Sequence, residues 1–546
     1  MKNGLMNRLA IFALPLVLSS CLVGPDYVKP PTATPPTPEY KETSDINFRP
    51  ATPRDSIDRG PWWNIYGDGN LEQLVAQVDV SNQNLKAQEA AYRQAVALVR
   101  QTQSSLYPTI GYTGAVNQNS SSGSRSTAGL QTAAAGNSVG QYASGGTLTW
   151  EIDVWGRIRR SIESNSAAAQ ASAADLAAAR LSAQSSLVTN YFSLRVSDQR
   201  RRLLEASVAA YARSMQIVQN QVNAGVASRV DLTQAQTLYE QTRAQLVAEG
   251  VTRAQYEHAI AALVGKTPAE ISVATAPLPP EVPTIDGGVP SALLERRPDI
   301  AAAERQMASA NAQIGAAQAA YYPDITLNAS INFVSTLIST LFQINSAVWS
   351  VGPQLAGTLV DGGGRAAQVD SARASYDQAV ATYRQTVITA FQQVEDSLAQ
   401  QRVLLQQEAV QRAAVTAARE AERLSLNQYR AGTVPYTTVI QTQTAALSSE
   451  QTMLNVRLSR FAASATLITA LGGGWQNTQL PPPVYIPGVK QTQTPAATAT
   501  SSAPVVAPLA SSSAAPPVTP VSAGSSAAAP DRPRRPWWPF LSSDSP

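Results

Sequence analysis

The chain has 546 residues, only 14% of which are charged, and its formal net charge is +3. A single cysteine and a single histidine exclude a disulfide, a Cys-rich zinc site and most hydrolase or metalloenzyme centres, so we expect no catalytic activity, no cofactor and no metal. No cluster of basic residues lies in the region that we expect to fold, so nucleic acid is not an expected partner.

The N-terminal segment, residues 1–20, predicts an export signal. Two basic residues flank the start of an apolar stretch of roughly ten residues, too short for a helix that spans a hydrocarbon core of ~30 Å. The stretch ends in Leu18-Ser19-Ser20-Cys21, which resembles the cleavage and lipidation box of bacterial lipoproteins. We therefore expect cleavage before Cys21, a covalent lipid on its thiol, and sorting to the outer membrane because Leu22 rather than an aspartate follows. The alternative is an ordinary signal peptide in which Cys21 is incidental.

Two segments of low complexity flank the rest of the chain. Residues 21–62 are rich in proline and polar side chains, so we expect the lipidated cysteine to continue into an extended periplasmic tether rather than into the core. Residues 481–546 are rich in Pro, Ala, Ser and Thr and poor in large apolar side chains, which predicts a disordered tail.

An internal duplication decides the architecture of the remaining chain. Residues 84–110 align with residues 299–325 at an offset of 215. The offset falls to 208 where Asp153, Gly156 and Arg157 meet Asp361, Gly364 and Arg365, and then settles at 207. We place the first repeat at 63–275, a linker at 276–290 and the second repeat at 291–480.

Each repeat shows the same order of elements. A helical stretch (70–105 and 291–320) precedes residues that alternate between apolar and polar, most clearly in 147–154 and 325–333. Such alternation is typical of membrane β-strands, apolar outward and polar inward, although a half-buried strand of a soluble protein shows it too.

A long helical hairpin follows the strands in each repeat. From Arg157 to Asn223, and from Arg365 to Arg430, the chain has no proline and almost no glycine. A helix of this length, with its rise of 1.5 Å per residue, extends for ~100 Å. Gly225 and Gly432 end these helices, and we expect a second helix to return from each of these turns at the hairpin tips.

The strand count requires an oligomer. Two hairpins per chain give four strands, whereas the smallest membrane barrels have eight, and an open sheet edge cannot face lipid. The chain therefore cannot span a membrane alone, and two, three or four copies have to supply 8, 12 or 16 strands.

Several motifs, in a common order, resemble the TolC-like outer membrane factors, specifically the lipoprotein branch that serves RND efflux systems. The resemblance covers about residues 21–485. The matching motifs are Leu18-Ser19-Ser20-Cys21, Val23-Gly24-Pro25-Asp26-Tyr27, Pro61-Trp62-Trp63, Trp150-Glu151-Ile152-Asp153-Val154-Trp155-Gly156-Arg157, Arg296-Arg297-Pro298-Asp299-Ile300, Tyr321-Tyr322-Pro323, Asp361-Gly362-Gly363-Gly364-Arg365 and Gln428-Tyr429-Arg430-Ala431-Gly432.

The resemblance implies an α+β membrane protein of two structural repeats, each a β-hairpin plus a long α-helical hairpin. It implies a homotrimer whose 12-strand barrel in the outer membrane of a Gram-negative bacterium continues into a periplasmic α-helical barrel. The implied partners are a periplasmic adaptor, an inner-membrane RND transporter and outer-membrane lipid. The implied function is a passive exit duct for drugs or other small molecules. The alternatives are the duct of a type I protein secretion system and, in a different class, a trimeric coiled-coil adhesin or structural protein.

The resemblance also indicates where a gate would lie. In the family the tips of the helical hairpins constrict the periplasmic entrance, and Tyr429 and Arg430 match that pattern, with Asp231 as the nearest acidic group of the first repeat. Gln441 stands where relatives often carry an aspartate, so the sequence does not decide whether the second repeat contributes an acidic ring. A purely structural role for Tyr429 and Arg430 is the alternative.

Two carboxylates are candidates for the channel lining. Glu151 and Asp153 lie in the alternating segment 147–154, on the polar side of the pattern. We therefore expect both side chains to face the lumen of the barrel.

Overall fold

The computed structural model describes most of both repeats and two short N-terminal pieces. The described residues all belong to one compact unit, residues 1–493. The predicted export signal and the lipidated Cys21 lie outside the described residues, as do most of the linker and of the C-terminal segment. The described ranges are 22–32, 40–41, 61–120, 138–283, 285 and 296–484.

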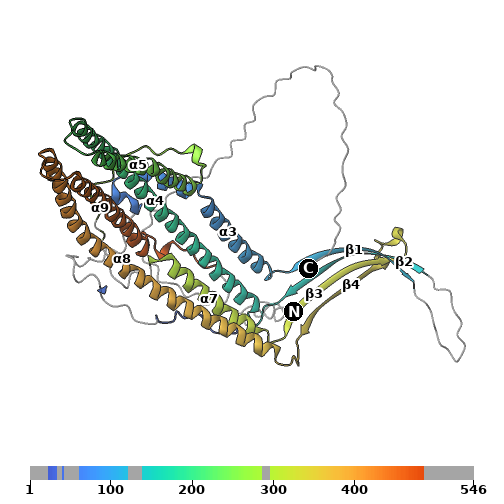
Figure 1. The fold of residues 1–546 in the computed structure, drawn as a ribbon. Helices are drawn as coiled ribbons and strands as arrows, with labels where there is room; N and C mark the ends of the chain where they lie inside the picture. The colour runs from blue at the N-terminus through green and yellow to red at the C-terminus, as the bar shows by residue number, and fades with distance from the viewer. Residues whose placement is uncertain are drawn as a thin grey trace, which may run out of the picture. The chain divides into compact units, whose positions relative to one another are not determined.

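Both repeats contain a helix, two strands, a long helix and a shorter returning helix, in that order, and the first repeat has one further helix, α2, before them (Figure 1). The first repeat comprises α2 (Gly69–Ser81), α3 (Gln83–Ser104), β1 (Thr109–Ser120), β2 (Ser138–Glu151), α4 (Arg157–Asn223) and α5 (Arg229–Leu263). The second comprises α7 (Pro298–Ala319), β3 (Asp324–Ser335), β4 (Ala347–Ala356), α8 (Gly364–Arg430) and α9 (Tyr436–Ala470). Short 3₁₀ helices are η3 (Trp62–Tyr66), η4 (Pro268–Glu270), η6 (Ile338–Thr340), η7 (Ile344–Ser346) and η8 (Asn477–Gln479).

The two repeats correspond residue by residue. Helices α3 and α7 have 22 residues each and begin 215 positions apart, while α4 and α8 have 67 residues each and begin 207 positions apart. Helices α5 and α9 have 35 residues each at that second offset. The offset of 207 already holds at Gly156 and Gly363, which precede the long helices. Gly156 therefore corresponds to Gly363, and our alignment of it with Gly364 is wrong by one residue.

The long helices end at the two glycines that the sequence singled out. Gly225 has φ of 74° and Gly432 has φ of 76°, a left-handed conformation that glycine adopts without a Cβ clash. In both turns the N–H after the glycine donates to a carbonyl five residues back, Val226 to Gln221 and Thr433 to Gln428. These bonds satisfy carbonyl groups that the helix end leaves without partners.

Helix α4 lies at the centre of the unit, since it packs against α2, α3, α5, α7 and α9. Far from the sheet the core is aromatic, and Phe192 of α4 stacks on Phe461 of α9 with ring centroids 4.3 Å apart. The repeats therefore share one core and are not two separate domains. Among the described residues, no helix is both long enough and apolar enough to cross a bilayer.

The four strands form one antiparallel sheet in the order β1-β2-β3-β4, so β2 and β3 join the two repeats. The alternation in the sequence produces two different faces. One cross-strand row holds Ile110, Leu148, Ala329 and Val351. The next row, whose side chains point to the opposite face, holds Gly111, Thr147, Ser330 and Ser350. Within the described chain, β1 and β4 each pair with one strand only, which leaves two open edges.

The segment that we expected to be a free tether is partly packed. Arg160 of α4 donates to the carbonyl oxygens of Val23, at 3.2 Å, and Gly24, at 3.0 Å, and pairs with Asp26 at 3.0 Å. Tyr40 is buried in a cluster with residues of α7 and α8. The expectation is therefore wrong for residues 22–32 and 40–41, and also for Trp62 at the end of the predicted tether, which is buried in the core. Proline prevents a helix, but it leaves carbonyl groups free to accept bonds from a buried arginine.

The described start of the predicted C-terminal tail is packed as well. Gln170 of α4 donates to the carbonyl oxygen of Pro481 at 2.9 Å, and the N–H of Val484 donates to Ser166 Oγ at 3.2 Å. The boundary at 481 is therefore too early, because both ends of the segment 481–484 have hydrogen-bond partners on α4. Residues 485–546 lie outside the described residues.

Two glycines with similar backbone angles provide a test of the packing. Gly265, with φ of 73°, abuts the carbonyl oxygen of Ser81, which a Cβ would overlap, whereas a Cβ on Gly225 would meet no atom within 4 Å. We expect Gly225→Ala to lower the free energy of unfolding by about 1 kcal/mol, the cost of the left-handed conformation. Gly265→Ala should cost about 2–4 kcal/mol, because overlap adds to that strain. Guanidinium titration in detergent measures both, and equal losses would contradict the close approach.

Candidate functional site

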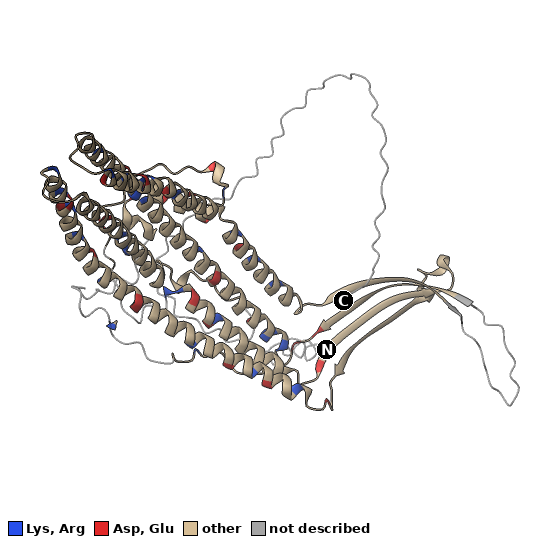
Figure 2. Cartoon of the chain, in the orientation of Figure 1, with Lys and Arg blue, Asp and Glu red and all other residues tan. Residues whose placement is uncertain are grey.

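The sheet is almost free of charge. The second hairpin has no charged residue between Asp324 and Asp361, and Glu151 is the single charged residue in the described part of β1 and β2. Figure 2 shows the contrast with the helices, which carry charges along their length. On the apolar face, large side chains such as Ile110 (78% exposed) and Leu355 (68% exposed) are not covered by other described residues. Such a surface fits hydrocarbon, and the hydroxyl and amide groups of the other face fit water.

The two carboxylates expected in the channel lining have different environments. Asp153 lies beyond the end of β2, and its carboxylate accepts the backbone N–H groups of Ile158, at 3.1 Å, and Arg159, at 2.9 Å. It also pairs with the Arg159 side chain at 3.2 Å, and both side chains are buried. The expectation that Asp153 faces the lumen is therefore wrong, because the unpaired N–H groups and positive end of α4 bind its carboxylate.

Glu151, in contrast, is the last residue of β2 and is half-buried. Both of its carboxylate oxygens accept from Arg157 Nη2, at 2.6 and 2.7 Å. In the second repeat, Asp361 binds the start of α8 much as Asp153 binds the start of α4. Hydrogen bonds from the Arg365 side chain and from the N–H groups of Arg365 and Gly363 lower the pKa of Asp361 to about 2.

At the hairpin tips, a small apolar cluster joins the two hairpins of one chain. It contains Val218 of α4, Ala235 of α5, Tyr429 of α8, and Tyr436 and Val439 of α9. The rings of Tyr429 and Tyr436 lie 5.0 Å apart. Burial, with smaller contributions from Tyr429 and Asp231, raises the pKa of Tyr436 to about 12, so that side chain stays neutral at physiological pH.

The three gate candidates differ in their surroundings. Tyr429 is buried, and its hydroxyl has no hydrogen-bond partner among the described residues. Asp231 forms a capping box with Ser228 at the start of α5, with hydrogen bonds of 3.2 and 3.3 Å. Arg430, the last residue of α8, is exposed and makes no hydrogen bond or ion pair from its side chain within the described chain. The structure thus places Tyr429 in the cluster and leaves Arg430 at the surface.

Sequence reasoning missed Tyr436, although it is almost completely buried beside Tyr429. A local signal existed, because Pro435 precedes it and proline marks the start of a helix. Ser425 and Thr442, whose hydroxyl oxygens lie 2.6 Å apart, form a second link between α8 and α9 that the sequence did not reveal.

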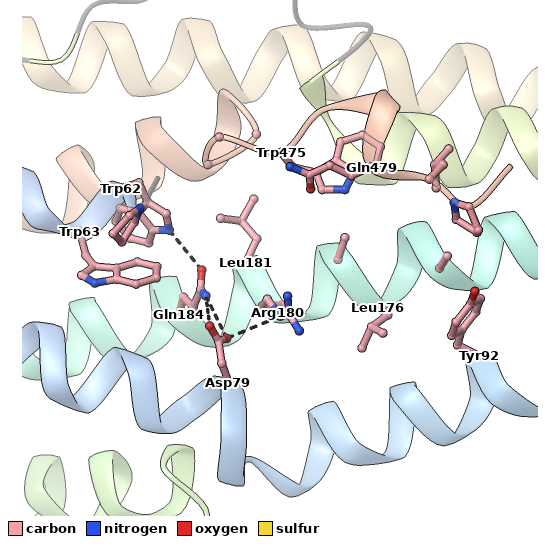
Figure 3. Close-up of a pocket in the computed structure, with 18 residues that line it drawn as sticks. Trp62, Trp63, Asp79, Tyr92, Leu176, Arg180, Leu181, Gln184, Trp475 and Gln479 are labelled. Carbon is pink, nitrogen blue, oxygen red and sulfur yellow. Dashed lines mark hydrogen bonds and ion pairs between the residues drawn. The ribbon is translucent and has the colours of Figure 1, made fainter. Parts of the chain in front are cut away.

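A pocket of about 590 Å³ lies between α2, α3, α4 and the segment after α9 (Figure 3). Trp62 Nε1 donates to Gln184 Oε1 at 3.2 Å, and Gln184 Nε2 donates to Asp79 at 3.0 Å. Arg180 pairs with Asp79 at 3.6 Å. These polar groups bind one another across α2 and α4, which is a structural role, and they form no arrangement of nucleophile and base.

Comparisons with known proteins agree with this geometry. The sequence profile of a family described as outer membrane efflux protein matches residues 74–266 and 289–473. The cation efflux system protein CusC of Escherichia coli is 26% identical over 478 residues, which cover 86% of this chain and 99% of that protein. The toluene efflux pump outer membrane protein TtgC of Pseudomonas putida is 29% identical over 480 residues, 86% of this chain and 96% of that protein. The solved outer-membrane channel OprN is 27% identical, with a TM-score of 0.75, over 84% of this chain and 100% of that one.

The orphaned hydroxyl of Tyr429 leads to a test of its role. We expect Tyr429→Phe to leave the free energy of unfolding unchanged or to raise it by up to about 1 kcal/mol, since it removes a buried group without a partner. Tyr429→Ala should lower it by about 3–4 kcal/mol through the cavity that it leaves. Denaturant titration in detergent measures both variants. A loss for Tyr429→Phe as large as that for Tyr429→Ala would show that the hydroxyl has a partner in the assembled protein.

Proposed function

The chain belongs to the outer membrane efflux protein family, and from that premise we propose that three copies close one barrel and form the exit duct of a tripartite efflux pump. Its place is the outer membrane, and its role is to let exported compounds leave the cell. The observation that carries the proposal is the four-strand sheet with one apolar face, one polar face and two open edges. Three copies supply twelve strands, which is within the range of closed membrane barrels.

The helices extend the duct away from the membrane. Helices α4 and α8 have 67 residues each, which corresponds to a length of ~100 Å at 1.5 Å per residue. Such helices reach far across a periplasm, where we propose that an adaptor protein and an inner-membrane RND transporter meet their tips. The duct itself is passive, and the transporter supplies the energy.

We propose a lipid on Cys21 as a second anchor. The residue that follows, Leu22, lies against Gly156, and the N–H of Val23 donates to the carbonyl oxygen of Trp155 at 3.2 Å. These contacts hold the N-terminal segment at the junction between β2 and α4. In a barrel of this kind, that junction lies at the inner surface of the membrane, where an acyl chain can insert.

The proposed gate lies at the hairpin tips. Tyr429 holds the two hairpins of one chain together, and the exposed guanidinium of Arg430 is the group available to a neighbouring copy. Its planar fork suits a carboxylate or carbonyl acceptor. Asp231, already engaged in its capping box, is a weaker candidate for that acceptor. Exposed links of this kind are worth no more than about 1 kcal/mol each, so adaptor contacts can outweigh them.

The exported compounds are small molecules in this proposal. The names of CusC and TtgC refer to cation efflux and toluene efflux, and both relatives cover most of this chain. One duct architecture therefore serves chemically different pumps, and selection takes place upstream. These names favour efflux over protein secretion. The duplicated sheet and hairpin argue against a coiled-coil adhesin, because an adhesin stalk needs no such strands.

Electrical recording tests both the duct and its gate. Purified wild-type protein in planar bilayers should form channels of low conductance. Arg430→Ser should raise that conductance severalfold. In cells, the same variant should increase sensitivity to large antibiotics such as vancomycin. Arg430→Lys, which keeps the charge, should have a smaller effect. Arg423→Ser is the matched control, because Arg423 lies on the same helix and pairs with Glu420 at 2.5 Å.

The outcomes separate the two parts of the proposal. A trimeric Arg430→Ser variant that conducts like the wild type would move the gate elsewhere. Failure of every variant to conduct, together with unchanged efflux in a deletion strain, would overturn the duct.

Mass spectrometry of the N-terminal peptide tests the anchor. We expect the mature chain to begin at Cys21 with several acyl chains, since a single chain anchors only marginally. We expect Cys21→Ser to assemble in part, because the barrel also holds the protein in the membrane. An unmodified Cys21, or cleavage at another position, would refute the lipid.

A further inference from the structure

In the sheet and in the helices next to it, the described residues form one joint between the two repeats. In the sheet, β2 of the first repeat pairs with β3 of the second, with Thr149 opposite Asn328. In the helical part, α4 packs against α7. By the correspondence of the repeats, β4 and α8 are the counterparts of β2 and α4, and β1 and α3 are the counterparts of β3 and α7. The chain therefore carries both halves of a second joint, and these halves do not contact each other within the described residues.

Burial shows that these two halves lack a partner among the described residues. Helix α7 buries a nearly continuous series of small and apolar residues, whereas the buried residues of α3, which has the same length, are Leu85 and Val99. The first four turns of α4 bury residues on most of their circumference, whereas the corresponding turns of α8 bury Val369. The open sheet edges of β1 and β4 belong to the same two halves.

The internal pairing fixes the register of the missing strand contact. Thr109 lies opposite Thr149, and Asp324, its counterpart, lies opposite Ala356, so Ala356 corresponds to Thr149. Asn328 corresponds to Thr113 at the offset of 215. The contact between Thr149 and Asn328 therefore becomes a contact between Ala356 of one copy and Thr113 of the next.

The faces of the sheet agree with this register. Thr113 and Ala356 both lie on the face that carries Thr147 and Ser330. In this register, Leu355 of one copy would lie opposite Gly114 of the next, and both residues belong to the apolar face. A slip by one residue would place apolar side chains of one copy beside polar side chains of the next, which the burial of one face forbids.

The helical half of the joint shows an exchange of large and small residues. In the internal joint, Arg160 of α4 lies over Gly315 of α7, where a Cβ would come within 2.9 Å of its Nε. The counterparts are Ala367 on α8 and Arg100 on α3. The long side chain and the small residue have changed sides, so in a joint between copies the arginine would come from the opposite helix.

The charges have complementary positions as well. Arg160 pairs with Glu163 at 2.8 Å, and Asp370 is the counterpart of Glu163. Asp370 is 73% exposed and meets Arg373 at 3.5 Å, an exposed contact of little strength. Arg100 is exposed and makes no side-chain hydrogen bond or ion pair within the described residues. If the joint between copies has the geometry of the internal joint, the guanidinium of Arg100 from the neighbouring α3 would approach Asp370.

We infer that adjacent copies join along a residue-specific seam that copies the internal joint. Ala356 of β4 lies opposite Thr113 of the next copy, and Asp370 of α8 forms an ion pair with Arg100 of the next copy's α3. The inference rests on the proposed assembly of several copies, but its residues come from contacts within one chain.

Paired cysteines test the strand register. Thr113→Cys combined with Ala356→Cys should give disulfide-linked multimers up to the full ring under mild oxidation, because directly opposed residues approach the geometry that a disulfide needs. Thr149→Cys with Asn328→Cys is the positive control and should crosslink within one chain. Thr113→Cys with Gln354→Cys, two residues out of register on the same face, should crosslink at least tenfold more slowly.

The outcomes distinguish an error in the proposed strand register from an error in the proposed assembly. Faster crosslinking through position 354 than through position 356 in a native oligomer would overturn the register. Native mass spectrometry that finds only monomer would instead overturn the proposed assembly.

A charge exchange tests the ion pair. Arg100→Asp and Asp370→Arg should each reduce the fraction of oligomer that survives heating in detergent, and the double variant should recover at least half of the loss. Arg100→Lys and Asp370→Glu keep the charges and should behave like the wild type. Single variants without effect, or a double variant weaker than either, would overturn the ion pair.

Discussion

A backbone group that faces hydrocarbon needs a hydrogen-bond partner, and this requirement determines the architecture of the protein. The sheet exposes apolar side chains on one face, yet β1 and β4 each lack a neighbour within the described chain. Four strands cannot close on themselves, because the smallest membrane barrels have eight. The surface that conducts is therefore a property of the assembly, and no single chain contains a lumen.

The helices have to follow the spacing that the strands set. Neighbouring strands lie ~4.8 Å apart, whereas packed helices lie ~8–10 Å apart. Next to the sheet, α4 and α7 bury small residues such as Ala167, Ala171 and Gly315, which let helices approach closely. Farther along α4 the buried side chains become large, with Tyr191 and Phe192, and η3 inserts Tyr66 beside them. The core along α4 therefore changes from small residues near the sheet to aromatic residues farther away.

The features that the sequence predicted are those encoded by local pattern. The alternation of apolar and polar residues predicted the two faces of the sheet. The stretch without proline between Gly156 and Gly225 predicted the length of α4. What local pattern could not predict was the choice of partner. Asp153 looks like a strand residue in an alternating run, but the adjacent helix start binds its carboxylate. The proline-rich segment before residue 32 has no pattern that predicts packing, but its carbonyl groups accept hydrogen bonds from Arg160, which lies 137 positions away from Val23. Such long-range choices are made by three-dimensional proximity, which no short window of sequence contains.

The differences between the repeats have a physical reason. A joint within one chain needs no recognition, because the linker already brings its halves together, and Arg160 is free to bind the N-terminal segment through Val23 and Gly24. A joint between copies has to select one orientation from many encounters, and complementary charges supply that selectivity more than they supply affinity. The position of Gly315 in the internal joint carries Arg100 in the outer one, and an exposed Asp370 stands where its guanidinium would arrive. The two joints thus share one plan. The inner joint carries both its arginine and its acid on α4 and uses Arg160 to hold the N-terminal segment, whereas the outer joint carries Arg100 and Asp370 on opposite helices.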